Sequence, residues 1–198
     1  MSTFRIALWA LVGVVAVMVG VLALQSTRHG APEFAGAGEA AIGGPFTLVD
    51  QRGRTVTRED LIGTPHALFF GYTHCPDVCP TTLWEMAAHM RRLGERADDM
   101  KVVFVTVDPA RDTPEALAAY VSNFDERMLA LSGSREAVDE AVRNYRAFYK
   151  IHEPDEQGDI LVDHTASVYL FDASGAFRGT IAYGEAPDTA FAKLERLV

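Results

Sequence analysis

The only two cysteines of this 198-residue chain lie four positions apart, where a buried strand is expected to lead into a helix. Cys75 and Cys79 are each followed by a proline, and the apolar run Ala67–Phe70 precedes them. Apolar residues then recur at three- and four-residue spacing from Leu83 to Leu93, which indicates a helix. Two thiols on a strand-to-helix turn can form a disulfide, bind a soft metal ion, or do each in turn.

The two prolines stiffen the turn that carries both sulfurs. Pro80 favours the first turn of a helix, which places Cys79 near the N-cap, where free amides and the positive helix end stabilise a thiolate. Pro76 biases Cys75 toward an extended conformation. A disulfide across so short a loop removes little chain entropy. The pair therefore indicates a redox or metal site rather than a structural staple.

Strands and helices alternate through residues 45–198. Hairpins are predicted at 46–57 and 167–182, strands at 67–71, 101–107 and 128–131, and helices at 82–95, from 113 onward, at 134–145 and at 186–197. Residues 150–163 are polar and acidic and carry no predicted element. The order predicts an α/β fold with a mostly parallel sheet, helices on both faces and an antiparallel edge from the last hairpin. A thioredoxin-like fold with an added N-terminal β-hairpin has this arrangement.

The N-terminal part has a different composition. After a short tail, 1–5, the stretch Ile6–Leu24 is nineteen apolar or glycine residues without charge, long enough to span a membrane as a helix. It is longer than the apolar region of a cleaved signal peptide, which is the alternative. Residues 25–44 are rich in Ala and Gly and predict a flexible linker with a reach of roughly 25 Å. We expect a single transmembrane anchor, 6–24, and one domain, 45–198, outside the cytoplasm.

The net charge of −9 limits the possible partners. Residues 45–198 hold 16 basic and 25 acidic side chains, so the whole excess lies in the predicted domain. Phosphate backbones and anionic lipids repel such a surface. A nucleic-acid role is therefore not expected.

A copper site needs one histidine beside the two thiolates, because Cu(I) accepts two sulfurs and one imidazole, whereas structural zinc needs four ligands. His164 precedes a strand that enters the core, and in a thioredoxin-like fold this loop lies beside the cysteine turn. From position alone, it is either a ligand or an ordinary loop histidine. His74 adjoins Cys75 but is expected to point away. His66 is expected in a turn and His89 on the exposed side of a helix.

Three further residues are candidates for a supporting role. Asp108 and Arg111 follow the predicted central strand at its carboxyl end, where α/β sheets place their sites, and can pair to brace the cysteine loop. Asp77 lies inside that loop and either tunes the sulfurs, marks a docking surface or is a solvated turn residue. The acidic run 153–156 either faces a basic partner or is a solvated loop.

Four spaced segments resemble one family. The segment Phe70–Thr81, with the sequence FGYTHCPDVCPT, closely resembles the signature of Sco/SenC proteins, the copper chaperones of cytochrome c oxidase assembly. The segments 107–115, 131–134 and 162–170 match in the same order. The resemblance implies a thioredoxin-like fold and one copper ion, Cu(I) or Cu(II), bound by Cys75, Cys79 and His164.

The resemblance also implies partners and a location. The acceptor would be the binuclear copper centre of cytochrome c oxidase subunit II, and the domain would face the periplasm from the inner membrane; no copper donor or thiol reductant is implied. Two functions then compete: a metallochaperone, and a thiol–disulfide oxidoreductase that reduces the cysteines of that copper centre. A peroxidase would need a lone reactive cysteine, and the pairing of Cys75 with Cys79 argues against it.

Overall fold

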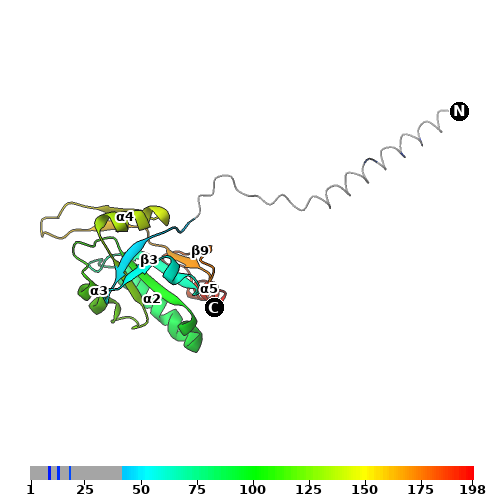
Figure 1. Cartoon of the computed structure of the whole chain (residues 1–198), viewed down its shortest axis with the longest axis horizontal. Coiled ribbons are helices and arrows are strands. Elements are labelled where there is room, and N and C mark those ends of the chain that lie inside the picture. The colour runs from blue at the N-terminus through cyan, green and yellow to red at the C-terminus, as the bar shows by residue number, and fades with distance from the viewer. Residues whose placement is uncertain (1–8, 10–12, 14–17, 19–41) are drawn as a thin grey trace. The chain divides into compact units, whose positions relative to one another are not determined.

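The computed structural model describes residues 9, 13, 18 and 42–198 (Figure 1). Residues 42–198 fall within the second of two compact units, Ala41–Val198. The predicted tail 1–5 lies outside the described residues, as do nearly all of the predicted anchor 6–24 and linker 25–44. Within the described part of the chain, no helix has both the length and the apolar character needed to cross a membrane.

The second unit contains nine strands and four α-helices in its described residues. The strands are β1 (Thr47–Asp50), β2 (Thr55–Thr57), β3 (His66–Gly71), β4 (Lys101–Thr106), β5 (Leu129–Ser132), β6 (Tyr149–Ile151), β7 (Val162–His164), β8 (Val168–Phe171) and β9 (Phe177–Ile181). The helices are α2 (Val78–Leu93), α3 (Pro114–Val121), α4 (Arg135–Asn144) and α5 (Pro187–Glu195), with short 3₁₀ helices at Glu59–Leu61 and Gly94–Asp99. Thr113 and Ser134 cap α3 and α4 through their side chains.

Seven strands form one sheet in the order β2-β1-β5-β4-β3-β8-β9. Only the central pairs, β3 with β4 and β4 with β5, are parallel, while the other four pairs are antiparallel. The predicted mostly parallel sheet is therefore wrong, although both predicted hairpins are confirmed. The reason is that a hairpin at each edge joins the parallel core through a strand that runs the opposite way.

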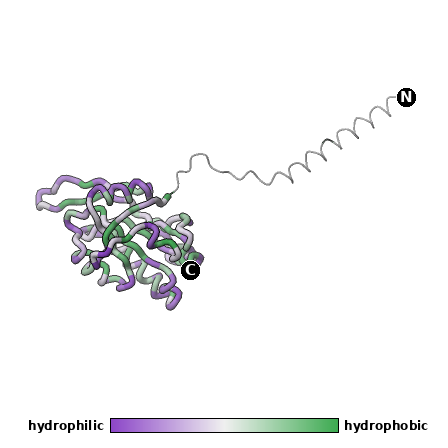
Figure 2. Tube along the Cα trace, in the orientation of Figure 1, coloured by the Kyte–Doolittle hydropathy of each residue, from purple (hydrophilic) through white to green (hydrophobic). Residues whose placement is uncertain are grey.

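Helices cover both faces of the sheet, as predicted. Neighbouring residues of a strand point to opposite faces, and all six residues of β3 are buried. Phe69 faces Phe104 of β4, whose ring lies 5.7 Å from that of Tyr120 on α3. Phe70 faces the other way, and its ring lies 5.8 Å from that of Tyr145, directly after α4. In Figure 1, α4 and α2 lie on opposite sides of the strands, and Figure 2 shows hydrophobic segments between them.

Helix α2 begins at Val78, four residues before the predicted start at Thr82. The first four N–H groups of a helix have no acceptor within it. Pro80 therefore forfeits no hydrogen bond at the third helical position, and the helix can include it. As a result, Cys79 lies inside the first turn rather than at the cap.

The acidic stretch 150–163 contains an element that the sequence pattern did not reveal. Strands β6 and β7 pair antiparallel with Tyr149 opposite His164, as a separate two-stranded sheet. We call residues 148–164 the arm; it extends from the upper left of the domain in Figure 1, and its end is hydrophilic in Figure 2. Each strand has only three residues, too few for a clear alternation.

Two histidines lie in the core rather than at the surface. His66 was predicted in a turn but is the first residue of β3, where its ring stacks on Phe171 at 4.9 Å. His89 was predicted to be exposed but is buried on α2, with its ring 6.1 Å from that of Phe191 of α5. Helix α5 covers this part of α2, so the local helical pattern could not distinguish it from a solvent-facing position.

Candidate metal centre

The cysteine turn connects the end of β3 to α2 and is closed by backbone hydrogen bonds. The N–H of Cys75 donates to the carbonyl of Tyr72 at 3.3 Å, and the N–H of Cys79 donates to the Cys75 Sγ at 3.4 Å. Asp77 is the N-cap residue of α2, but its side chain makes no capping hydrogen bond. The Cys75 sulfur thus satisfies an amide of the first turn, and the positive helix end favours its thiolate form.

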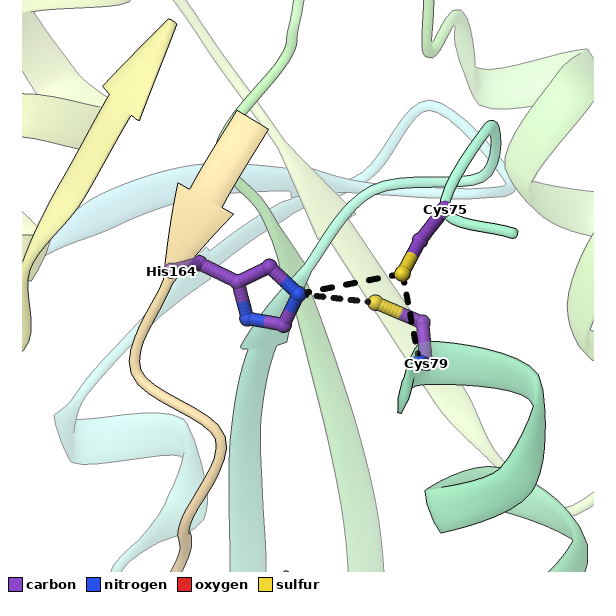
Figure 3. A group of neighbouring side chains, drawn as sticks. All are labelled: Cys75, Cys79 and His164. Atoms are coloured by element: carbon purple, nitrogen blue, oxygen red, sulfur yellow. Dashed lines mark hydrogen bonds between the residues drawn. The ribbon is translucent and has the colours of Figure 1, made fainter. Parts of the chain in front are cut away.

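His164 brings an imidazole from the end of β7 to these two sulfurs (Figure 3). Its Nε2 lies 3.3 Å from the Cys79 Sγ and 3.9 Å from the Cys75 Sγ. The three potential ligand atoms lie within 4.8 Å of one another. Both cysteines are free thiols, with Cys79 buried and Cys75 partly exposed. The arrangement offers two sulfurs and one nitrogen to a single ion.

Contacts around His164 orient its ring and define its tautomer. Nδ1 lies 3.1 Å from the carbonyl oxygen of Thr165. A carbonyl only accepts, so Nδ1 carries the proton and Nε2 is left with the lone pair that a metal requires. The rings of Phe69 and Tyr72 lie edge-on to the imidazole at 5.7 Å and 5.8 Å.

Tyr72 and Arg111 attach the arm to the cysteine side of the domain. The Val162 N–H donates to the Tyr72 hydroxyl at 3.2 Å, and the Arg111 guanidinium donates to the carbonyl of Ile160 at 3.0 Å. Arg111 also forms an ion pair with the buried carboxylate of Asp108. The expected pairing of Asp108 with Arg111 is thus present, and it holds the segment that leads to His164.

Asp112 is a supporting residue that sequence reasoning missed. Its fully buried carboxylate accepts hydrogen bonds from the Thr73 N–H at 3.0 Å, the Thr73 hydroxyl at 2.6 Å and the Thr106 hydroxyl at 2.5 Å. These bonds connect the start of the cysteine turn to the end of β4. An aspartate between Arg111 and Thr113 resembles any turn residue in sequence, because its burial depends on strands far from it.

The two remaining polar candidates are not part of the three-residue ligand group. His74 is bonded through Nδ1 to the Thr73 hydroxyl at 3.0 Å and is not part of the three-residue group, which agrees with its expected orientation. Asp77 is exposed, and its carboxylate accepts only from the Thr81 hydroxyl, at 3.4 Å, among the described residues. Asp77 borders an open cleft of about 310 Å³ that is also lined by Cys75 and His164.

The two thiols differ in acidity. The hydrogen bond from the Cys79 thiol lowers the pKa of Cys75 to about 3, with help from the backbone amides of Cys79 and Asp77 and against a smaller effect of burial. Burial raises the pKa of Cys79, and the neighbouring Cys75 raises it further. The pair is therefore a partly exposed thiolate at Cys75, supported by a buried thiol at Cys79.

This difference predicts how the thiols react with iodoacetamide. The thiolate is the form that reacts. For an ordinary thiol with a pKa of about 8.5, the thiolate fraction falls about tenfold for each pH unit below the pKa. Because the pKa of Cys75 lies near 3, its alkylation rate in the folded, metal-free protein should change by less than about twofold from pH 8 to pH 5. Mass spectrometry of peptides should find Cys79 unmodified. Urea-unfolded protein is the control, and an equal pH dependence there and in the folded protein would contradict the assignment.

The fold and the site together define the class. A thioredoxin-like domain with two thiols and one imidazole gathered at the carboxyl end of its central strands has the ligand set of a metal-binding member of that fold, and this set suits a soft ion. The model of one family, SCO1/SenC, matches residues 35–198.

Individual relatives agree. Protein SenC of Rhodobacter capsulatus is 41% identical over 170 residues, which cover 82% of this chain and 76% of that protein. The human mitochondrial SCO1 homolog is 39% identical over 142 residues, or 71% of this chain and 47% of that protein. The chain thus spans about half the length of this mitochondrial relative. The protein belongs to the SCO1/SenC family.

Solved structures show the same fold. The structure of Bradyrhizobium japonicum ScoI with copper bound has 44% sequence identity and a TM-score of 0.74. The match covers 80% of this chain and 100% of the ScoI chain. Yeast Sco1 with copper bound is 32% identical with a TM-score of 0.73, covering 79% and 87%. The described domain is similar to both along nearly its whole length.

Proposed function

We propose that this protein is a copper metallochaperone that binds one copper ion through the sulfurs of Cys75 and Cys79 and Nε2 of His164. The observation that carries the proposal is the gathering of these three atoms within 4.8 Å from two distant segments. Two soft sulfurs and one imidazole suit Cu(I) in particular. The copper-bound structures of the Bradyrhizobium and yeast relatives support the choice of ion.

The site is suited to passing its ion on as well as holding it. Cys75 and His164 both line the open cleft, so the ligands of an acceptor can approach the ion from solvent. With only three protein ligands, an incoming thiolate or imidazole can add before one of them leaves. Oxidation of the pair to a disulfide would remove both sulfur ligands, so metal loading requires reduced thiols.

The acceptor and the location that we propose are those that the family resemblance implies. We propose delivery to the binuclear copper centre of cytochrome c oxidase subunit II. Residues 6–24 would anchor the protein in the inner membrane by a single span, and residues 25–44 would tether the domain 45–198 in the periplasm. The nineteen uncharged residues of the first segment and the Ala- and Gly-rich composition of the second support this scheme.

A second function is favoured by the acidity of the pair. A thiolate at Cys75 that is open to the cleft can attack a partner disulfide, and the buried Cys79 thiol can then resolve the mixed disulfide. The protein would then be a thiol–disulfide oxidoreductase that prepares the cysteines of the same copper centre. Asp108, Arg111 and Asp112 would support either function by holding the two halves of the site together.

Copper titration of the reduced protein distinguishes the two functions. The wild-type protein should bind one copper ion, and His164→Ala should bind it at least roughly a hundredfold more weakly. Loss of a residue that only hydrogen-bonds to a metal ligand costs up to about a hundredfold in affinity, and loss of a ligand should cost at least as much. Competition with a chelator of known affinity gives both constants. His152→Ala is the matched control, since its imidazole lies on the same arm but pairs with Asp163 at 2.8 Å.

One result would favour the oxidoreductase instead. If His164→Ala bound copper as tightly as the wild type and still reduced a disulfide peptide that carries the paired cysteines of the subunit II copper centre, the metal would not depend on the proposed ligand set. The three-ligand copper site would then be ruled out, and the oxidoreductase would be the better-supported function.

A further inference from the structure

The cleft beside the metal site has an apolar border. Pro76 and Val78 line it on the side of the cysteine turn, and Leu161 lines it on the side of the arm. The side chain of Leu161 is 49% exposed, and this residue directly precedes β7, the strand that ends at His164. An exposed leucine at the entrance of a metal site is costly to leave in water and is available for contact with another molecule.

Around this border the charge is negative. The arm holds five acidic residues against one lysine, Lys150. Glu153, Glu156 and Asp159 are exposed, and their carboxylates make no ion pair or side-chain hydrogen bond with any residue from 42 to 198. Asp77 and Asp163 line the cleft itself.

Two arginines close to the cleft direct their guanidinium groups to partners other than the acidic residues of the arm and the cleft. Arg111 pairs with Asp108 and donates to the carbonyl of Ile160. Arg135 donates to the carbonyl of Val107 and to the Tyr149 hydroxyl. Among residues 42–198, the carboxylates of Asp77, Glu153, Glu156 and Asp159 have no cationic partner and can attract a cation from outside, whereas that of Asp163 contacts His152.

We propose that this rim, formed by Pro76, Asp77, Val78, Leu161 and Asp163 with the acidic end of the arm, is the docking surface for the copper partner. The inference rests on the proposed function, because a partner that exchanges ligands with Cys75 or His164 must enter this cleft. The surface fits a protein segment that carries lysine or arginine and an apolar side chain beside its own thiol ligands. The opposite charges steer the encounter, and the apolar contact prolongs it.

Other occupants fit the surface poorly. An anionic membrane or a nucleic acid would meet like charge. A second copy of this chain would bring its own acidic rim against this one, which like-charge repulsion disfavours. The basic, apolar segment is the occupant that both features of the rim favour.

The test measures copper transfer from the loaded full-length protein to synthetic peptides. Both peptides carry Cys-x-x-x-Cys, one with flanking Lys and Leu and the other with flanking Glu and Leu. The Lys peptide should accept copper about tenfold faster at low salt, the lower end of electrostatic steering. The difference should disappear at 1 M salt, where charges are screened beyond about 3 Å.

Two pairs of variants localise the effect. The first pair begins with a triple variant of the arm, Glu153→Gln/Glu156→Gln/Asp159→Asn. This variant should lose most of the preference for the Lys peptide. The control is the triple variant Glu95→Gln/Asp99→Asn/Glu126→Gln, which changes net charge equally just before the amino ends of β4 and β5 and should retain the preference. Leu161→Asn should slow transfer to both peptides at every salt concentration, whereas Ile62→Asn, another exposed apolar residue, should not. An equal effect of the two charge variants would overturn the proposal, as would equal rates for the two peptides at low salt.

A second measurement separates this proposal from the proposed function. The reduced, metal-free protein is mixed with the disulfide form of each peptide. The Cys75 thiolate attacks the peptide disulfide, Cys79 displaces the peptide from the mixed disulfide, and the peptide leaves as a dithiol while the protein retains a Cys75–Cys79 disulfide. If copper binding failed but the Lys peptide still reacted faster, the docking surface would stand without the chaperone. If copper bound but neither measurement showed a preference, the chaperone would stand without this surface.

Discussion

Replacing Cys79 with serine should lower the affinity for copper about a thousandfold. Thiolate metal sites in zinc proteins contribute about 10–16 kcal/mol, so loss of one ligand in three removes about 4 kcal/mol. A hydroxyl is a hard and weakly acidic group that cannot replace a thiolate toward Cu(I). Among the described residues, the group of potential ligands contains only Cys75, Cys79 and His164, so no further Cys, His or carboxylate is placed to take over the role of Cys79. Chelator competition on the reduced protein measures the change.

Stability must be followed in the same experiment, because Cys79 is fully buried. Thermal unfolding of the metal-free variant shows whether the domain remains folded. Cys75→Ser provides the second variant: Cys75 is partly exposed and should lose comparable affinity with less effect on folding. Wild-type affinity in either folded variant would rule out the proposed ligand set.

Adding one methyl group at Gly71 should damage both the fold and the metal site. A Cβ at this position would lie 2.6 Å from the Cys79 Sγ and 2.8 Å from the Phe104 Cε2, closer than atoms of these types pack. Gly71→Ala should therefore destabilise the metal-free protein by about 1–3 kcal/mol, as overpacking of a core does. The displaced sulfur should also lower copper affinity, by about tenfold to a hundredfold.

Gly133→Ala is the matched control for this substitution. Its added Cβ would lie 2.9 Å from the Leu48 Cδ2, a milder clash in a place without a metal ligand. It should lower stability while leaving copper affinity unchanged. If Gly71→Ala retained wild-type affinity at the cost of stability alone, the glycine would serve only packing and would not position the sulfur.

Much of the domain was predictable because its signals are local. The hairpins around Gly53 and Gly175, the buried run of β3 and the caps Thr113 and Ser134 depend on residues close together in the chain, and the structure contains each of them. The start of α2 and the two short strands of the arm were missed, because a proline in the first helical turn and three-residue strands give weak or misleading local patterns.

The sequence by itself determined that two thiols stand on a strand-to-helix turn, and through its family resemblance it indicated His164 as their partner. Only the tertiary structure decided how they meet. Tyr72 and Arg111 hold the arm so that the His164 Nε2 faces both sulfurs. The buried carboxylate of Asp112 holds the start of the cysteine turn through its hydrogen bond from the Thr73 N–H. The tertiary structure also decided that the sheet is mixed, with parallel pairs only at its centre. These features depend on contacts between segments far apart in the chain. Such contacts contribute to stability only when the whole domain has packed.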